Sequence, residues 1–483
     1  FLTAFRAPNM LRDLFAEGAL STAFVTTFSK EITTRGDKSA WALANKVATL
    51  TTVFMSAVTL VGVLFAPQLI SILAPGFDPS KADLTILLTR IMFPFILLVS
   101  LAALVMGMLN AKDVFGVPAM ASSFFNLGSI IGGVAFAWWF DPHFGTRSLI
   151  GLSLGTLIGG FLQLAVQVPS LWKVGYVFRP DFAWRHEGVR KVLQLMGPAV
   201  IAASAVQVNV LINSVFASYL QDGAVSWLNI AFRLMQLPLG IFGVAVATVT
   251  LPLVSRSAAS GNMEEFRGAL AHALRLVMLL TIPSAIGLII LSEPIIALIY
   301  QHGRFTFLAT QQTAAALRFY AFGLVGYASV KVLAPAFYAL DRRNLPMFVS
   351  LFSIALNFCL NWTLTFHMKL GHKGLALSTS VVAITNFTLL YIMMRRYAGR
   401  LESGAMFLTF AKLLLAGACL GIVCWLGLYF FFAHGIPDSG GMRLLGVGTT
   451  VVTGAAVFFG AAYLLRVAEL HDLVGVLKRR ITR

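Results

Sequence analysis

Apolar runs of about 20 residues recur along the whole chain, and each is long enough to cross the hydrocarbon core of a bilayer. The 483 residues are 58% hydrophobic and only 11% charged. A soluble chain of this length could not cover its surface with so few polar groups. Lipid offers no partners for backbone groups, and the alternation expected of a barrel is absent, so helices are favoured. The sequence therefore predicts an all-α polytopic membrane protein.

The apolar runs predict thirteen membrane helices. They are expected at residues 1–29, 41–73, 84–110, 117–140, 147–172, 189–220, 224–254, 265–299, 311–340, 345–367, 374–397, 405–433 and 443–466. One set of alternate connections and ends holds 21 Lys and Arg residues. The opposite set holds only Lys81, Arg147, Arg304, Lys369, Lys373 and Arg443.

This bias predicts that the basic connections and the C-terminus face the cytoplasm. It also accounts for the net charge of +17 without nucleic acid. Thirteen helices would then place Phe1 outside, whereas an uncleaved chain more easily begins inside. We therefore expect one further helix before Phe1; the alternative is an odd-numbered protein with an external N-terminus.

The chain also repeats itself. Arg90, Ala111, Asp113 and Pro118 recur 228 residues later as Arg318, Ala339, Asp341 and Pro346. Ala4-Phe5-Arg6 recurs as Ala231-Phe232-Arg233, and Gly151-Leu-Ser-Leu-Gly-Thr156 is similar to Gly374-Leu-Ala-Leu-Ser-Thr379. With a helix before Phe1, the pattern predicts two six-helix repeats and two additional C-terminal helices. The expected parts are an N-terminal lobe at 1–172, a cytoplasmic linker at 173–188, a C-terminal lobe at 189–400, and the last two helices with a basic tail at 401–483. Carriers are often built from two such repeats with the site between them.

Three basic residues, Arg12, Arg233 and Lys331, lie well inside apolar helices. Each costs roughly 2.5–3.5 kcal/mol at the centre of a membrane helix, so each is expected to face water or a partner. Asp13 and Glu17 lie near Arg12 and are candidates for a local ion pair or gate. The surplus of interior positive charge predicts an anion site, to which Arg6 and Asn9 on the first helix also belong. Structural ion pairing is the alternative.

Arg90, Arg318, Lys412 and Arg466 lie near helix ends, where long basic side chains reach the headgroups. Asn357 and Asn361 share one helix face and are a candidate cation site, although hydrogen bonding between helices is the more common role of such residues. No P-loop and no zinc motif is present. No metal site, cofactor or enzymatic activity is therefore expected.

At its start the chain carries Phe5-Arg-Ala-Pro-Asn-Met-Leu-Arg12, then Leu14-Phe-Ala-Glu-Gly-Ala-Leu-Ser21. This stretch closely resembles the signature of the MurJ (MviN) family, which flips lipid II and belongs to the multidrug/oligosaccharidyl-lipid/polysaccharide exporter superfamily. Further similar segments include Arg90-Ile-Met-Phe-Pro-Phe95, Ser260-Gly-Asn262 and Lys331-Val-Leu-Ala-Pro335. The resemblance implies fourteen helices and matches the family's cavity cations to Arg12, Arg233 and Lys331. Phe232 and Gln236 stand where some relatives carry an acid, which weighs against sodium coupling.

The resemblance and the interior cations together predict a flippase that carries lipid II from the cytoplasmic to the outer leaflet of the bacterial plasma membrane by alternating access. Arg12, Arg233 and Lys331 would bind its pyrophosphate, and the membrane potential or a coupling cation could drive the transport. We expect a monomer that binds no nucleic acid. The alternatives are a cation-coupled multidrug exporter, a flippase for another polyprenyl-pyrophosphate-linked oligosaccharide, or a scaffold that transports nothing.

Overall fold

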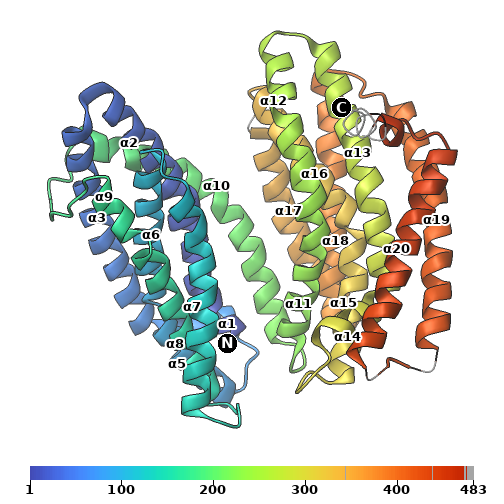
Figure 1. Cartoon of the computed structure of the whole chain (residues 1–483), viewed down its shortest axis with the longest axis horizontal. Helices are drawn as coiled ribbons and strands as arrows, with labels where there is room; N and C mark the ends of the chain where they lie inside the picture. The colour runs from blue at the N-terminus through green and yellow to red at the C-terminus, as the bar shows by residue number, and fades with distance from the viewer. Residues whose placement is uncertain (343, 434, 438, 473–474, 476–483) are drawn as a thin grey trace. The chain divides into compact units, whose positions relative to one another are not determined.

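The computed structural model describes residues 1–342, 344–433, 435–437, 439–472 and 475. At 16–19, 22, 198–199, 201–203 and 205–206 it describes the backbone alone. All regular elements in these described ranges are helices, and none is a strand (Figure 1). The all-α prediction is therefore confirmed, and the chain divides into two compact units, Phe1–Tyr219 and Leu220–Arg483.

The first unit contains ten α-helices and one π-helical segment, η1, within its described residues. They are α1 (Leu2–Leu11), η1 (Arg12–Leu20), α2 (Ser21–Arg35), α3 (Asp37–Leu64), α4 (Ala66–Leu73), α5 (Pro79–Met92), α6 (Phe95–Asn110), α7 (Gly116–Phe140), α8 (Ser148–Ala165), α9 (Val168–Lys173) and α10 (Glu187–Ser218).

The second unit likewise contains ten α-helices and two π-helical segments in the part that the structure describes. They are α11 (Ala224–Pro238), η2 (Leu239–Val244), α12 (Ala245–Ala259), α13 (Met263–Ile290), α14 (Ser292–Tyr300), α15 (Phe307–Phe322), α16 (Leu324–Ala339), α17 (Asn344–Trp362), η3 (Thr363–His367), α18 (His372–Ala398), α19 (Ser403–Phe432) and α20 (Gly440–Leu464).

Ten helices among the described residues are long and apolar enough to cross a membrane, or eleven if the bent pair α15–α16 counts as one span. The other two expected spans, 1–29 and 189–220, are helical as well, and both include residues with only the backbone described. Several spans consist of two elements in the structure. For example, the expected helix 84–110 is α5 followed by α6, because Pro94 lies at the junction and cannot donate a backbone hydrogen bond.

Helices of similar length follow one another in the same order in both units. The 28-residue α3 is followed by the short α4, and the 28-residue α13 by the short α14. The next spans, α5–α6 and α15–α16, are each interrupted near the middle. Helix α10 packs against η1 and α2 and so groups with the first unit.

The α15–α16 span bends by 44° at Gly323. A Cβ at Gly323 would lie 2.7 Å from the Cα of Ser380 on α18, so the close approach requires glycine. The Ser380 hydroxyl donates to the carbonyl of Phe319, at 2.6 Å. A side chain from a neighbouring helix thus satisfies a carbonyl near the break, as the membrane interior requires. A proline inside a membrane helix commonly bends it, yet α16 continues through Pro335 and the sharp bend lies at Gly323.

The last two helices pack side by side along one edge of the second unit (Figure 1). Charged groups join them to α13. The Arg275 guanidinium donates to Glu402 at 2.6 Å and also to Glu469, whose side chain is 1% exposed. A basic residue within an apolar helix is thereby neutralised by two carboxylates that lie outside the membrane helices.

The α7–α8 pair packs most closely in the first unit, through glycines. A Cβ at Gly155 would lie 2.3 Å from both the N and the Cα of Gly133, whereas no atom lies within 4 Å of a Cβ built at Gly287 of α13. We therefore expect Gly155→Ala to lower the free energy of unfolding by about 1–3 kcal/mol, because two helix backbones must separate. Gly287→Ala is the matched control and is expected to be neutral or slightly stabilising. Thermal unfolding of the purified protein measures both, and equal melting temperatures would contradict this packing.

Candidate functional site

Helix α11 has one apolar face packed inside the second unit and one polar face that is largely exposed. Ser226, Asn229, Arg233 and Gln236 follow one another at intervals of three or four residues, so they share a face. Asn229 is half-buried and the other three are exposed. The opposite face is buried and consists of Ala224, Trp227, Leu228, Ala231 and Met235. A face with four polar residues in an apolar helix suits water or a polar ligand rather than acyl chains.

Lys331 occupies a comparable position on α16. Its neighbours Ala328, Val332 and Leu333 are buried in the unit, whereas Lys331 itself is exposed. Tyr338 is exposed on the same face, two turns further along. Within the described part of the chain, neither Arg233 nor Lys331 forms a hydrogen bond or an ion pair. Both cations are thus available to an external anion.

In the first unit, Arg12 begins η1 and is paired with its neighbour. Its Nε and a terminal nitrogen donate to Asp13 Oδ1 at 3.3 and 3.1 Å. The other carboxylate oxygen of Asp13 accepts from Asn9 at 3.5 Å and from Gln207 of α10 at 3.4 Å. Arg12 is 22% exposed and Asp13 33% exposed. The structure therefore joins Arg12, Asn9 and Asp13 in one partly open polar cluster.

Two further residues, Arg6 and Glu17, are expected near this cluster, and the structure describes the side chain of Arg6 only. Arg6 is half-buried on α1, one turn before Asn9. The side chain of Glu17, the second candidate partner of Arg12, lies outside the described residues.

The two units carry a π-helical segment at the same distance from a basic residue. In the first unit η1 begins six residues after Arg6, and in the second unit η2 begins six residues after Arg233. These two arginines are the repeated residues of the Ala-Phe-Arg motif. Short π-helical segments are uncommon and occur frequently at functional sites. Each unit thus has an irregular helical segment at the same distance from its Ala-Phe-Arg motif.

Asn357 and Asn361 are fully buried between α17 and α18. The Asn361 amide donates to Asn357 Oδ1 at 2.7 Å, and the Ser378 hydroxyl of α18 donates to Asn361 Oδ1. Two turns along, the Ser353 hydroxyl donates to Asn386 Oδ1. We call this set, Ser353, Asn357, Asn361, Ser378 and Asn386, the α17–α18 polar ladder. Among the described residues, no group of three or more His, Cys, Asp or Glu could hold a metal ion.

Sequence reasoning singled out the cations but missed two of their polar neighbours. Asn229 could have been found from its spacing to Arg233, four residues along one helix face. Gln207 could not, because it lies 194 residues from Asp13 and only the fold brings the two together. Phe232 and Gln236, which stand where some relatives carry an acid, lie in different surroundings. Phe232 packs edge-on against Tyr320, whereas Gln236 belongs to the polar face of α11.

Comparison with known proteins identifies the family of this chain. The family profile described as "Lipid II flippase MurJ" matches residues 1–444. The Lipid II flippase MurJ of Burkholderia cenocepacia is 34% identical over 472 residues, which cover 96% of this chain and 90% of that protein.

Two solved structures share the fold. One is a "Lipid II flippase MurJ, inward closed conformation", with a TM-score of 0.74 and 23% identity over 95% of this chain and 91% of that one. The other is an inward-facing multidrug resistance MATE family transporter of the MOP superfamily, with a TM-score of 0.69 and 14% identity over 83% and 90%. The profile match and the relative's identity over nearly its whole length show that the chain belongs to the MurJ family of lipid II flippases.

Proposed function

We propose that this protein carries lipid II from the cytoplasmic to the outer leaflet of the bacterial inner membrane by alternating access. The observation that supports this most directly is the pair of exposed cations, Arg233 and Lys331, on apolar helices and without partners among the described residues. Leaving each charge in hydrocarbon would cost roughly 2.5–3.5 kcal/mol. A water-filled path that admits an anionic headgroup removes that cost.

The pyrophosphate of lipid II is the group that these cations would bind. A guanidinium presents paired N–H donors that suit two phosphate oxygens, and a lysine ammonium adds a compact charge. Arg233 and Lys331 would contribute these from the second unit and Arg12 from the first. Arg6 and Asn9 would assist on α1. Asp13 accepts from two of the five N–H donors of Arg12, so a phosphate would compete with that carboxylate for the guanidinium.

The charges on these faces favour an anionic substrate over a cationic drug. A drug exporter would need carboxylates to attract organic cations. The polar face of α11 contains Arg233 with three neutral residues, and Lys331 is the charged residue on the exposed face of α16. A flippase for another polyprenyl-pyrophosphate-linked oligosaccharide would use the same chemistry, and growth experiments separate the two.

The proposed orientation places the C-terminus in the cytoplasm, on the side of the 21 basic residues. The membrane potential then favours outward movement of a pyrophosphate. Moving about two negative charges away from a negative interior gains roughly 4–5 kcal/mol per 100 mV. We propose that this potential suffices without a coupling cation and that the protein acts as a monomer.

Replacement of the proposed binding residues tests the site. In cells depleted of their own lipid II flippase, we expect Arg12→Ala, Arg233→Ala and Lys331→Ala each to fail to support growth. Loss of one charge-assisted contact weakens anion binding by roughly 10- to 100-fold. Arg233→Lys should be intermediate, because lysine keeps the charge but not the paired donors.

The matched control is Arg90→Ala. Arg90 Nε donates to the carbonyl of Val63 in the first unit, so its loss should leave growth normal. Normal growth of the three alanine variants would refute the site. Failure of the unmutated chain, despite full membrane expression, would favour another lipid-linked substrate.

The role of the potential can be measured in proteoliposomes that contain fluorescent lipid II. The vesicles are chosen so that the cytoplasmic face of the protein lies inside, and a K⁺ gradient with valinomycin makes their interior negative. We then expect the lipid to appear in the outer leaflet faster than at zero potential. A potential of opposite sign should slow it, since roughly 2.3 kcal/mol per charge per 100 mV then opposes transport. Equal rates at the three potentials would contradict the proposed driving force.

Substitution within the α17–α18 polar ladder tests whether these residues join two helices or bind a cation. We expect Asn361→Leu to lower the free energy of unfolding by about 0.6–2 kcal/mol, the usual range for hydrogen bonds between membrane helices. Cys359→Leu, two residues away and exposed, is the control. Exchange of Na⁺ for choline should leave the melting temperature of the unmutated protein unchanged. A Na⁺-dependent stabilisation that Asn361→Leu abolishes would instead identify a coupling-cation site.

A further inference from the structure

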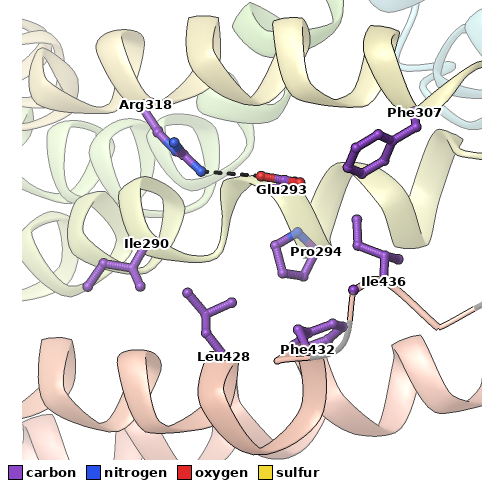
Figure 2. Close-up of a pocket in the computed structure, with 9 residues that line it drawn as sticks. Ile290, Glu293, Pro294, Phe307, Arg318, Leu428, Phe432 and Ile436 are labelled. Carbon is purple, nitrogen blue, oxygen red and sulfur yellow. Dashed lines mark ion pairs between the residues drawn. The ribbon is translucent and has the colours of Figure 1, made fainter.

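A pocket of about 240 Å³ lies in the second unit, at the end of α13 where α14 begins. Figure 2 shows one charged pair within an otherwise apolar lining, with Leu428 and Phe432 of α19 on the opposite wall. The lining residues are Ile290, Glu293, Pro294, Phe307, Arg318, Leu428, Phe432, Gly435 and Ile436. Elements from three parts of the chain thus form a cavity with both a polar and an apolar side.

The charged pair is loose and open. A terminal nitrogen of Arg318 lies 3.6 Å from Glu293 Oε2, too far for a hydrogen bond (Figure 2). Arg318 Nε donates to the Ser292 hydroxyl at 2.8 Å. The Arg318 side chain is 46% exposed and that of Glu293 30%. Most guanidinium donors and the carboxylate oxygens therefore remain open to another molecule.

The walls of the pocket are held by a third charged residue. Arg443 of α20 is 7% exposed and donates to the carbonyls of Ala297 and Gln301, at 2.9 and 3.0 Å. Its Nε donates to the carbonyl of Pro437. Arg443 thereby joins the end of α14 to the α19–α20 connection, so the cavity is part of the packed structure.

The charged pair has no counterpart at the corresponding positions of the first repeat, all of which the structure describes. Arg318 corresponds to Arg90 at the offset of 228, but Arg90 donates to the backbone carbonyl of Val63. Ser292 and Glu293 are the first two residues of α14, and the first two residues of α4, Ala66 and Pro67, carry no charge. The acid beside the arginine is therefore specific to the second repeat, where α19 lies across the pocket from the pair (Figure 2).

We propose that this pocket binds a phospholipid with a primary ammonium headgroup, such as phosphatidylethanolamine. The lipid phosphate bonds to Arg318 and its ammonium to Glu293, and an acyl chain lies along Leu428 and Phe432. Charge complementarity selects this occupant. The pair has no net charge and presents one group of each sign, as a zwitterionic headgroup does. An anionic lipid would meet repulsion from Glu293, and a quaternary ammonium cannot donate a hydrogen bond to it.

The pocket is distinct from the proposed transport site, which carries surplus positive charge. With the orientation proposed above, the α13–α14 junction lies at the outer leaflet, opposite the basic connections. The bound lipid would then link α14 and α15 to α19 at that leaflet.

Native mass spectrometry of the purified full-length chain tests the assignment, with dioleoyl lipids bearing ethanolamine, choline or glycerol headgroups. We expect the ethanolamine lipid to bind at least about tenfold more tightly than the other two. Arg318→Gln should weaken its binding by about tenfold or more. Glu293→Gln should remove the preference over the glycerol lipid. Arg90→Gln, the repeat counterpart, should leave binding unchanged.

Leu428→Trp fills the apolar side of the pocket without altering a charge and should also weaken binding. A monodisperse elution profile confirms that each variant is folded. Tighter binding of the glycerol or choline lipid to the unmutated protein overturns the proposal, as does equal loss in Arg90→Gln and Arg318→Gln. Tighter binding of undecaprenyl diphosphate than of the ethanolamine lipid, weakened in Arg318→Gln, would assign the pocket to the transported lipid and also overturn the proposal.

Discussion

The cost of placing a cation among apolar helices organises this molecule. In the second unit, some of these cations are compensated by other groups of the protein and some are not. Arg275 is neutralised by Glu402 and Glu469, and Arg443 is surrounded by backbone carbonyls. Arg233 and Lys331 receive no such compensation from the described residues. A fold that can satisfy an interior arginine in two different ways, yet leaves two others open, concentrates its unbalanced charge where a ligand can use it.

The sequence was sufficient for the features that follow from local composition. Each expected span is helical, because a run of about 20 apolar residues in lipid leaves the backbone few other options. Arg233 and Lys331 were identifiable because a charge in such a run needs an explanation. The partners of Arg275 were not, since Glu402 and Glu469 lie 127 and 194 residues away. The grouping of α10 with the first unit also depends on packing and has no local signal.

Departures from regular α-helix geometry were equally hard to foresee. A π-helical segment has no characteristic composition, and the bend at Gly323 depends on Ser380 of another helix. Proline positions alone do not locate the helix breaks, because α16 continues through Pro335 while the neighbouring break lies at Gly323. Even so, η1 and η2 begin at equivalent distances from Arg6 and Arg233. Irregular backbone therefore follows the polar residues of each unit, as expected where a membrane helix borders water.

The two units differ in how their cations would meet a diphosphate. Arg12 is already bonded to Asp13, which is itself held by Asn9 and Gln207, whereas Arg233 and Lys331 are open. A carrier must bind its cargo strongly enough to admit it and weakly enough to release it. Three open cations would favour capture at the expense of release. A carboxylate that competes for one of them would lower the affinity, and the Arg12–Asp13 pair would be neutral again once the substrate had left. The Arg12–Asp13 pair is therefore compatible with an anion site that must be emptied in every transport cycle.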